Sequence, residues 1–286
     1  MKLATFEHDG SERVGLVDEA EKRVHPIDVA DMVDLIARFD ELRPAIKAGS
    51  DGLGLDAVRL LAPIPRPMRN VICVGKNYRA HAKEFAQSGF EAGAVAGAEI
   101  DEYPAVFTKP SNCVVGTGAR VEMHPGVTEM VDYEVELTIV IGKGGRNIRR
   151  EDFRDHIFGY TIINDVTARD RQRNHKQWYL GKSLDTFCPM GPWITTADEV
   201  DAGNLQVRTW VNDELRQDAN TNDLIFDIPG LIETISAGTT LEPGDLIATG
   251  TPQGVGIGFK PPKFLKAGDV VTLSITGLGT LSNPFG

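Results

Sequence analysis

The residues after Asn70 carry many short runs of β-branched side chains, and this pattern constrains the fold more than any other feature of the sequence. The runs have the length of strands and are separated by turns that contain glycine and proline, whereas segments with helical spacing are few. This pattern argues against the alternating strand–helix units of a parallel α/β sheet. We therefore expect an α+β fold that is predominantly β. The expected strands are Val71–Val74, Ala105–Thr108, Tyr133–Ile141, Gly159–Ile163, Leu205–Val211, Asp245–Ala248 and Val270–Ile275, and the expected helices are Arg79–Gln87, part of Glu151–His156, and Ile228–Ala237.

A separate small domain is expected before the segment Ala62–Met68. Proline at positions 63, 65 and 67 resists both helix and sheet interiors, so this segment reads as a linker. The chain before it shows short strand-like runs and then a helical repeat over Val29–Ile46. We therefore expect a small α+β domain over residues 1–65 and a larger domain over residues 66–286. The expected N-terminal strands are Lys2–Glu7, Arg13–Val17 and Arg23–Ile27.

Charge and cysteine content limit the classes of partner. The formal net charge is −11, which argues against a nucleic-acid partner because such binding needs a basic surface. No apolar run approaches the roughly 20 residues of a membrane span, and the first residues show no secretory signal. Cys73, Cys113 and Cys188 are odd in number and far apart, so neither a disulfide scaffold nor a CxxC site is expected. We expect a cytoplasmic protein.

Two acidic residues interrupt the apolar run Tyr133–Ile141. Side chains alternate along a strand, so Glu134 and Glu136 would share one face while the apolar residues share the other. Two carboxylates on one face repel each other, and burying them requires a counter-charge. A divalent cation would supply it; exposure to solvent, or nearby lysine and arginine, would also resolve the repulsion.

A third acidic residue strengthens the metal hypothesis. Asp165 follows the apolar run that ends at Asn164, and strand ends commonly present functional groups. Three carboxylates from Glu134, Glu136 and Asp165 would form an all-oxygen site, which favours Mg²⁺ or Mn²⁺ over zinc and leaves positions open for substrate and water. The alternative for Asp165 is a helix N-cap.

His81 and Glu84 are candidates for a water-activating pair. They are three residues apart in an expected helix, so their side chains adjoin. A carboxylate beside an imidazole raises its basicity and fixes its tautomer. The alternative is an ordinary pair on a helix surface.

Three further segments have a functional and an ordinary interpretation. Lys182 follows an aromatic and apolar run and could stabilise developing negative charge, or could be a surface residue. The basic stretch Arg169–Lys176 could bind a carboxylate through Arg169, or could be a solvated helix face. The glycine-rich stretch Thr249–Gly256 could hold an anion with its backbone N–H groups and the Thr251 hydroxyl, or could be a plain loop. The stretch Gly89–Ala98 reads as a mobile loop that could act as a lid.

Taken together and in order, these segments resemble the fumarylacetoacetate hydrolase family, particularly its shorter bacterial members with a small N-terminal domain. The resemblance covers nearly all of the larger domain and only loosely the first 65 residues. It implies a mixed β-sandwich roll, a Mg²⁺ or Mn²⁺ ion on Glu134, Glu136 and Asp165, and a homodimer. The segments that carry it are Asn77-Tyr78, His81, Glu84, Glu134-x-Glu136, Asp165 to Arg169, Gln172, Lys182-Ser183 and Thr249 to Pro252.

The same resemblance implies roles for the remaining residues. His81 and Glu84 would activate water, and substrate or enolate contacts would come from Arg169, Gln172, Lys182 and Thr251. The leading hypothesis is a metal-dependent hydrolase that cleaves a C–C bond in an acylpyruvate-like or diketo acid. Oxaloacetate decarboxylation and isomerisation of a 2-hydroxyhepta-2,4-diene-1,7-dioate pass through a similar enolate and are the alternatives. A non-catalytic, metal-stabilised binding protein is the alternative of another class.

Overall fold

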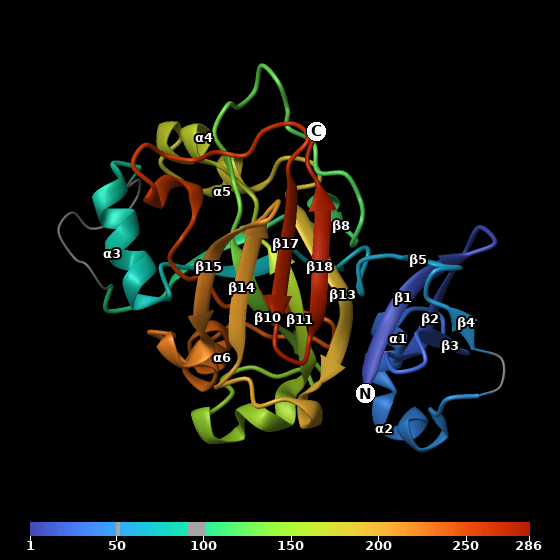
Figure 1. Cartoon of the computed structure of the whole chain (residues 1–286). Coiled ribbons are helices and arrows are strands. Elements are labelled where there is room, and N and C mark those ends of the chain that lie inside the picture. The colour runs from blue at the N-terminus through green and yellow to red at the C-terminus, as the bar shows by residue number, and fades with distance from the viewer. Residues whose placement is uncertain (50–51, 91–100) are drawn as a thin grey trace.

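The computed structural model describes residues 1–49, 52–90 and 101–286, and its regular elements are mostly strands (Figure 1). A large sheet of 12 strands runs across the molecule. The path of this sheet is β4 (Leu53–Gly54), β3 (Arg23–Ile27), β2 (Ser11–Asp18), β1 (Lys2–His8), β13 (Cys188–Thr196), β11 (Ile157–Asn164), β10 (Val135–Ile141), β16 (Leu246–Ala248), β6 (Val71–Gly75) and β7 (Ala105–Lys109), with β5 (Arg59–Leu60) beside β1 and β8 (Val114–Val115) beside β13.

A second sheet of four strands lies over the middle of the first (Figure 1). Its order is β15 (Glu214–Asn220), β14 (Gln206–Val211), β17 (Val270–Ile275) and β18 (Gly279–Pro284). The main hydrophobic core lies between the sheets, where Leu137 and Ile139 of β10 cluster with Val207 of β14 and Leu273 of β17. Burial of these apolar faces holds the two layers together. The expected β-rich sandwich is confirmed.

Strand β10 is the centre of the larger part of the molecule. It pairs antiparallel with β11 on one side and with β16 on the other, and every residue from Val135 to Ile141 is buried. The regular strand begins at Val135, two residues later than expected. Because both faces are covered, Glu136 is held inside the protein rather than on a solvated face.

The helices are short, and one expected helix is wrong as a single element. Instead of one helix over Val29–Ile46, the chain forms two helices and a 3₁₀ turn, because Arg38 leaves the helical region with φ −111° and ψ 16°. Asp31 caps the first helix by accepting a hydrogen bond from the Asp34 N–H group at 2.8 Å. The remaining elements are α1 (Met32–Ala37), α2 (Phe39–Leu42), α3 (Arg79–Ser88), α4 (Arg169–Asn174), α5 (Tyr179–Lys182), α6 (Ile228–Ser236), the short strands β9 (Val131–Asp132) and β12 (Thr167–Ala168), and the 3₁₀ turns η1 (Arg43–Ala45), η2 (Ser111–Cys113), η3 (Arg150–His156), η4 (Ala197–Glu199), η5 (Thr221–Asp223) and η6 (Gly256–Gly258).

The first strands of the chain extend the large sheet rather than forming a sheet of their own. Lys2 and Leu3 of β1 pair with Thr195 and Ile194 of β13, and a hydrophobic cluster joins Leu3 and Leu35 to residues of the larger part, including Val71. The division of the chain near residue 65 stays a prediction, since one sheet and one cluster run across that point.

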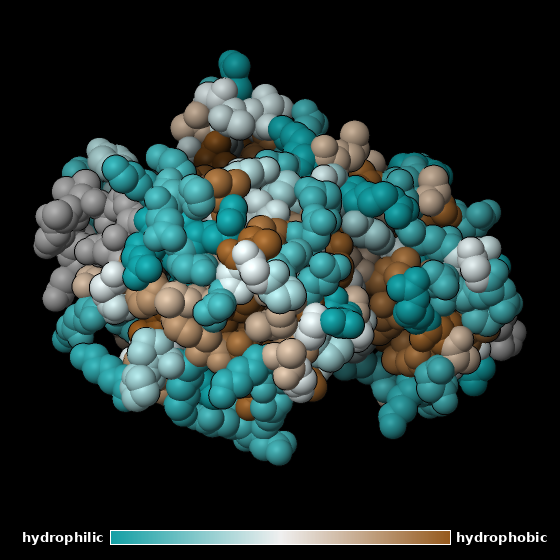
Figure 2. Space-filling view, turned by 90° about the horizontal axis from the view of Figure 1, so that it is seen from above, coloured by the Kyte–Doolittle hydropathy of each residue, from teal (hydrophilic) through white to brown (hydrophobic). Residues whose placement is uncertain are grey.

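Helices α3, α4 and α5 lie toward the same side of the molecule (Figure 1) and contain the candidate residues His81, Glu84, Arg169, Gln172 and Lys182. Seen from above, hydrophilic side chains dominate the surface, and hydrophobic ones form separate small groups rather than a band (Figure 2). Among the described residues, no helix has the length and apolar character needed to span a membrane.

Candidate active site and metal centre

Three buried carboxylates meet at the end of β10 and β11. Glu134, Glu136 and Asp165 each offer an oxygen within 4.8 Å of the others, and they are 4%, 1% and 0% exposed. Asp165 directly follows β11, and its N–H group donates to the Glu134 carbonyl at 2.9 Å, which brings the two strand ends together. Solvent exposure of the pair is therefore wrong as an explanation. The N-cap alternative for Asp165 is also wrong, because α4 begins at Arg169.

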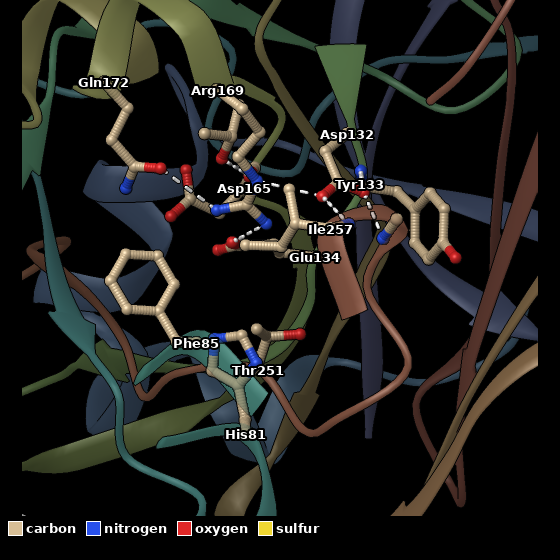
Figure 3. Close-up of polar contacts among 12 residues, drawn as sticks. His81, Phe85, Asp132, Tyr133, Glu134, Asp165, Arg169, Gln172, Thr251 and Ile257 are labelled. Carbon is tan, nitrogen blue, oxygen red and sulfur yellow. Dashed lines mark hydrogen bonds and ion pairs between the residues drawn. The ribbon is translucent and has the colours of Figure 1, made fainter. Parts of the chain in front are cut away.

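Three buried cations surround these carboxylates. Lys182 Nζ donates to Glu134 Oε2 at 2.8 Å and to Asp165 Oδ2 at 2.6 Å, so it bridges two of the acids. Arg169 NH2 lies 2.6 Å from Glu134 Oε1, and its Nε donates to Asp132 Oδ2 at 2.9 Å. Figure 3 shows Arg169 lying between Asp132 and Glu134. Lys182 and Arg169 are 2% and 1% exposed, so neither is a surface residue.

The third cation, Lys109, was not identified from the sequence. It ends β7, is 0% exposed, and its Nζ donates to Asp165 Oδ1 at 2.7 Å, to the Val166 carbonyl at 3.1 Å and to the Lys182 carbonyl at 2.5 Å. Burial opposes the charge of Lys109, but the Asp165 carboxylate raises its pKa above the ordinary value. Lys109 therefore ties a candidate metal ligand to the backbone of α5.

The charges in this cluster leave one carboxylate uncompensated. Asp132, Glu134 and Asp165 each have at least one cation as partner, whereas the contact to Glu136 is a hydrogen bond from the Gly250 N–H group at 2.9 Å. Desolvation, together with Asp165 and Glu134, raises the pKa of Glu136 well above 4.5. Burial also opposes ionisation of Glu134, but Lys182 and Arg169 lower its pKa to about 2.

A divalent cation fits this arrangement. Hard cations such as Mg²⁺ and Mn²⁺ take carboxylate oxygens, and an added positive charge would allow Glu136 to ionise beside its two neighbours. The free space next to the carboxylates is about 10 Å³, which has room for one ion or water molecule, so a substrate would enter beside the ion only when the rim of the cavity opens. Glu134, Glu136 and Asp165 would hold the ion.

His81 lines this cavity from α3, and Glu84 holds its ring from behind. His81 Nδ1 lies 3.0 Å from Glu84 Oε2, and Glu84 Oε1 accepts a hydrogen bond from the Gly254 N–H group at 2.9 Å. His81 is 4% exposed and, with Phe85, lies across the cavity from Glu134 (Figure 3). The surface-pair alternative is therefore wrong. Because Nδ1 is bound by Glu84, Nε2 is the ring nitrogen left for a substrate. The expected lid over Gly89–Ala98 falls mostly outside the described residues.

The glycine-rich loop after β16 binds anions, and these are carboxylates of the chain itself. The N–H groups of Gly250, Gly254 and Gly256 donate to Glu136, Glu84 and Asp132 respectively, at 2.9, 2.9 and 2.6 Å. Gly250 has a φ of +102°, and a Cβ there would lie 2.8 Å from the Asn77 Cβ, so glycine is required at this position. The loop thus orients the candidate metal ligand Glu136, the His81 partner Glu84 and the Arg169 partner Asp132.

Two further residues that we did not assign position this site. Asp132 accepts from Arg169 and from the Gly256 and Ile257 N–H groups, and it is 0% exposed. It lies two residues before Glu134, so extending the same alternation upstream would have identified it. The Asn77 side chain bonds the Phe226 and Thr249 carbonyls at 3.0 and 2.8 Å and the Phe226 N–H group at 2.7 Å, which fixes the start of the α3 segment.

The structure brings the expected site residues together: seven of them line one cavity, and Glu84 and Asp165 contact the lining residues His81 and Lys182. Gln172 Oε1 accepts from Arg169 NH1 at 3.2 Å, and Thr251 Oγ1 accepts from Gln217 Nε2 at 2.8 Å. Both side chains are 2% exposed. The roles of these residues toward a substrate stay predictions. The residues that line the cavity are Val74, Gly75, Lys76, His81, Phe85, Phe107, Glu134, Glu136, Arg169, Gln172, Trp178, Lys182 and Thr251.

Comparison with known proteins decides the family. Residues 70–285 match the model of the fumarylacetoacetate (FAA) hydrolase C-terminal domain. This chain belongs to the fumarylacetoacetate hydrolase family. It is 46% identical over 310 aligned positions to the oxaloacetate tautomerase YisK of Bacillus subtilis strain 168, with 100% of both proteins covered.

Two solved structures of the family have similar folds. One is a fumarylacetoacetate hydrolase from Exiguobacterium antarcticum, with a TM-score of 0.85, 41% identity, and coverage of 100% of this chain and 99% of that one. The other is a maleylpyruvate hydrolase from Sphingobium sp. SYK-6 in complex with manganese(II) ion and pyruvate, with a TM-score of 0.79, 36% identity, and coverage of 100% and 98%. The similar proteins include a tautomerase and hydrolases, which supports an enzyme rather than a binding protein.

Proposed function

We propose that this protein is a divalent-metal-dependent enzyme that catalyses the keto–enol tautomerisation of oxaloacetate. The observation that carries the proposal is the cavity between three buried carboxylates and the His81 ring. Similarity over the full length to an oxaloacetate tautomerase supports the choice of substrate. The reaction needs positive charge at one end of a 2-oxo acid and a base at the neighbouring carbon, and the cavity has both kinds of group on opposite sides.

The bound cation would act as a Lewis acid that favours the enolate over the keto form. His81 Nε2 would take the proton from C3, while Glu84 holds the ring through Nδ1 and stabilises the imidazolium that forms. The oxygen at C2 takes a proton from solvent and the His81 imidazolium releases the C3 proton to solvent, so the proton count balances and the neutral base is restored. Lys182 and Arg169 keep Glu134 ionised, and Phe85 and Phe107 exclude water from the side of the cavity.

Hydrolysis of a C–C bond in an acylpyruvate-like acid is the second candidate, and the His81–Glu84 contact favours it. Both reactions need a base. In hydrolysis the base must deprotonate a water molecule, and a histidine held by a carboxylate is well suited to that step. Oxaloacetate decarboxylation and dienedioate isomerisation would use the same carboxylates without an attacking water.

A substrate panel tests the proposal. Oxaloacetate, scored by enol absorbance, and 2,4-dioxo acids, scored by pyruvate release, are assayed with Mg²⁺ or Mn²⁺ and then with EDTA. We expect tautomerisation of oxaloacetate above the buffer rate, loss of that activity in EDTA, and a decrease of about 100-fold or more in His81→Ala. His175→Ala, at an exposed histidine, is the matched control.

The other outcomes separate the alternatives. Pyruvate release from 2,4-dioxo acids without tautomerisation would refute the proposal in favour of the hydrolase. Retained hydrolysis in His81→Ala would refute the water-activating role of His81. No turnover of any substrate would favour the binding protein.

We also propose a cytoplasmic homodimer, in line with the family resemblance. Size-exclusion chromatography with light scattering tests the dimer, and a monomeric mass would refute it.

A further inference from the structure

One cation that lines the cavity, Lys76, forms its ion pair outside the cluster of buried carboxylates. Lys76 lines the cavity, its side chain is 7% exposed, and its Nζ lies 2.5 Å from Asp101 Oδ2. Arg169 and Lys182, which line the same cavity, are paired with the buried acids of the metal centre. The Asp101 side chain is 22% exposed, so the partner of Lys76 lies toward solvent rather than toward the metal centre.

The backbone holds Lys76 in this place. Its φ is +52°, a left-handed conformation that a lysine rarely adopts and that has an energetic cost. On one side Gly75 ends β6, and a Cβ there would lie 2.1 Å from the Trp178 ring. On the other side Asn77 is fixed by its three side-chain hydrogen bonds. The surrounding structure therefore over-determines an unfavourable conformation, which is typical of a functional position.

The chemistry of the proposed substrate requires such a cation. A dicarboxylic 2-oxo acid carries a second carboxylate, and burying it without a counter-charge is costly. Val74, Phe85 and Phe107 make part of the cavity wall apolar and cannot compensate a carboxylate. Among the described residues that line the cavity, Lys76 is the cation whose partner lies outside the buried cluster.

We propose that Lys76 is a specificity-determining residue that binds the second carboxylate of a dicarboxylic 2-oxo acid, and that Asp101 holds Lys76 in place before the substrate displaces it. This inference rests on the proposed function, because it assumes that the 2-oxo acid end of the substrate lies at the carboxylate cluster. It assigns to Lys76 the discrimination between dicarboxylic and monocarboxylic acids.

Binding to the Mn²⁺-loaded protein tests the inference without turnover. Isothermal titration compares oxaloacetate with pyruvate, which keeps the 2-oxo acid end but lacks the second carboxylate. We expect Lys76→Met to weaken oxaloacetate binding by about 10- to 100-fold and to leave pyruvate binding unchanged. Lys76→Arg should restore most of the affinity. Lys83→Met, at an exposed lysine of α3, removes the same charge outside the cavity and should change neither.

Mn²⁺ affinity, measured by electron paramagnetic resonance, shows whether each variant keeps an intact metal centre. Equal weakening of both ligands in Lys76→Met would overturn the inference, as would a wild-type protein without preference for oxaloacetate. A Lys76→Met variant that retains the preference would overturn it as well. If the wild-type protein binds oxaloacetate through Lys76 but does not tautomerise it, the inference stands and the proposed reaction fails.

Discussion

The substitutions Glu134→Gln and Glu136→Gln should have very different effects on the stability of the metal-free protein. The two glutamates are two residues apart and equally buried, and each substitution removes one carboxylate with little change in volume. Glu134 makes ion pairs at 2.8 Å with Lys182 and at 2.6 Å with Arg169, whereas Glu136 has no such partner among the residues that the structure describes. The environments of the two carboxylates therefore differ in charge and not in burial.

The expected magnitudes follow from these contacts. Glu134→Gln leaves two buried cations with one partner fewer each, and breaking a buried ion pair costs about 3–5 kcal/mol. Glu136→Gln replaces a carboxyl group whose raised pKa favours the neutral form, and the amide oxygen can still accept from Gly250. We expect this variant to change the free energy of unfolding by less than about 1 kcal/mol, since no charge pair is lost.

Urea unfolding of EDTA-dialysed protein at pH 7, followed by tryptophan fluorescence, measures both effects. The m-values should agree among the variants, so that the midpoints report stability. Glu122→Gln, at an exposed position, is the control for a lost surface charge. Both active-site variants should lose more Mn²⁺ affinity than the roughly 10- to 100-fold typical of outer-shell changes. Equal destabilisation by the two substitutions would refute the assignment of Glu136 as the uncompensated carboxylate.

Three further predictions concern the supports of the site. Lys109→Met should destabilise the protein by about 3–5 kcal/mol in urea unfolding, because Asp165 loses a buried partner, and it should also weaken Mn²⁺ binding measured by titration. The lowered pKa of Glu134 stabilises the folded protein at pH values above 4.5, the ordinary pKa of a glutamate. This stabilisation is lost as the pH falls from 4.5 toward about 2, at up to about 1.4 kcal/mol per pH unit. Glu134→Gln should therefore reduce the pH dependence of the free energy of unfolding in this range, as measured by acid unfolding curves. Asn77→Ala should lower the free energy of unfolding by about 2–4 kcal/mol, because it removes the side-chain partner of the buried Thr249 carbonyl and of the partly buried backbone groups of Phe226; a thermal scan showing no change would contradict this.

The alternation of side chains along a strand identified the three acids of the candidate metal centre. Glu134 and Glu136 interrupt an apolar run, which placed them on one face of a strand, and Asp165 follows another apolar run, which placed it at a strand end. Their convergence needed the antiparallel pairing of β10 with β11, which is a long-range contact that spacing does not encode. Lys109 was missed for the same reason, because its partner Asp165 is 56 residues away.

Other parts of the fold were missed where local propensity and tertiary context disagree. Strand β13 contains Pro189 and Pro192, which argue against a central strand, yet its residues are buried between β11 and β1. The helical repeat over Val29–Ile46 gave the correct apolar positions but not the break at Arg38. The spacing of apolar residues predicts which side chains face the core, but it does not predict where a helix breaks.

The pairing of β1 with β13 has a mechanical consequence. Many two-domain enzymes admit substrate by a hinge motion of one domain. In this protein such a motion would break the backbone hydrogen bonds between β1 and β13 in a continuous sheet. This continuous sheet therefore joins the first strands of the chain to the strands that carry the candidate site. A substrate would therefore reach the candidate cavity through movement of its rim, which includes His81 of α3 and Lys76, while the sheet stays in place.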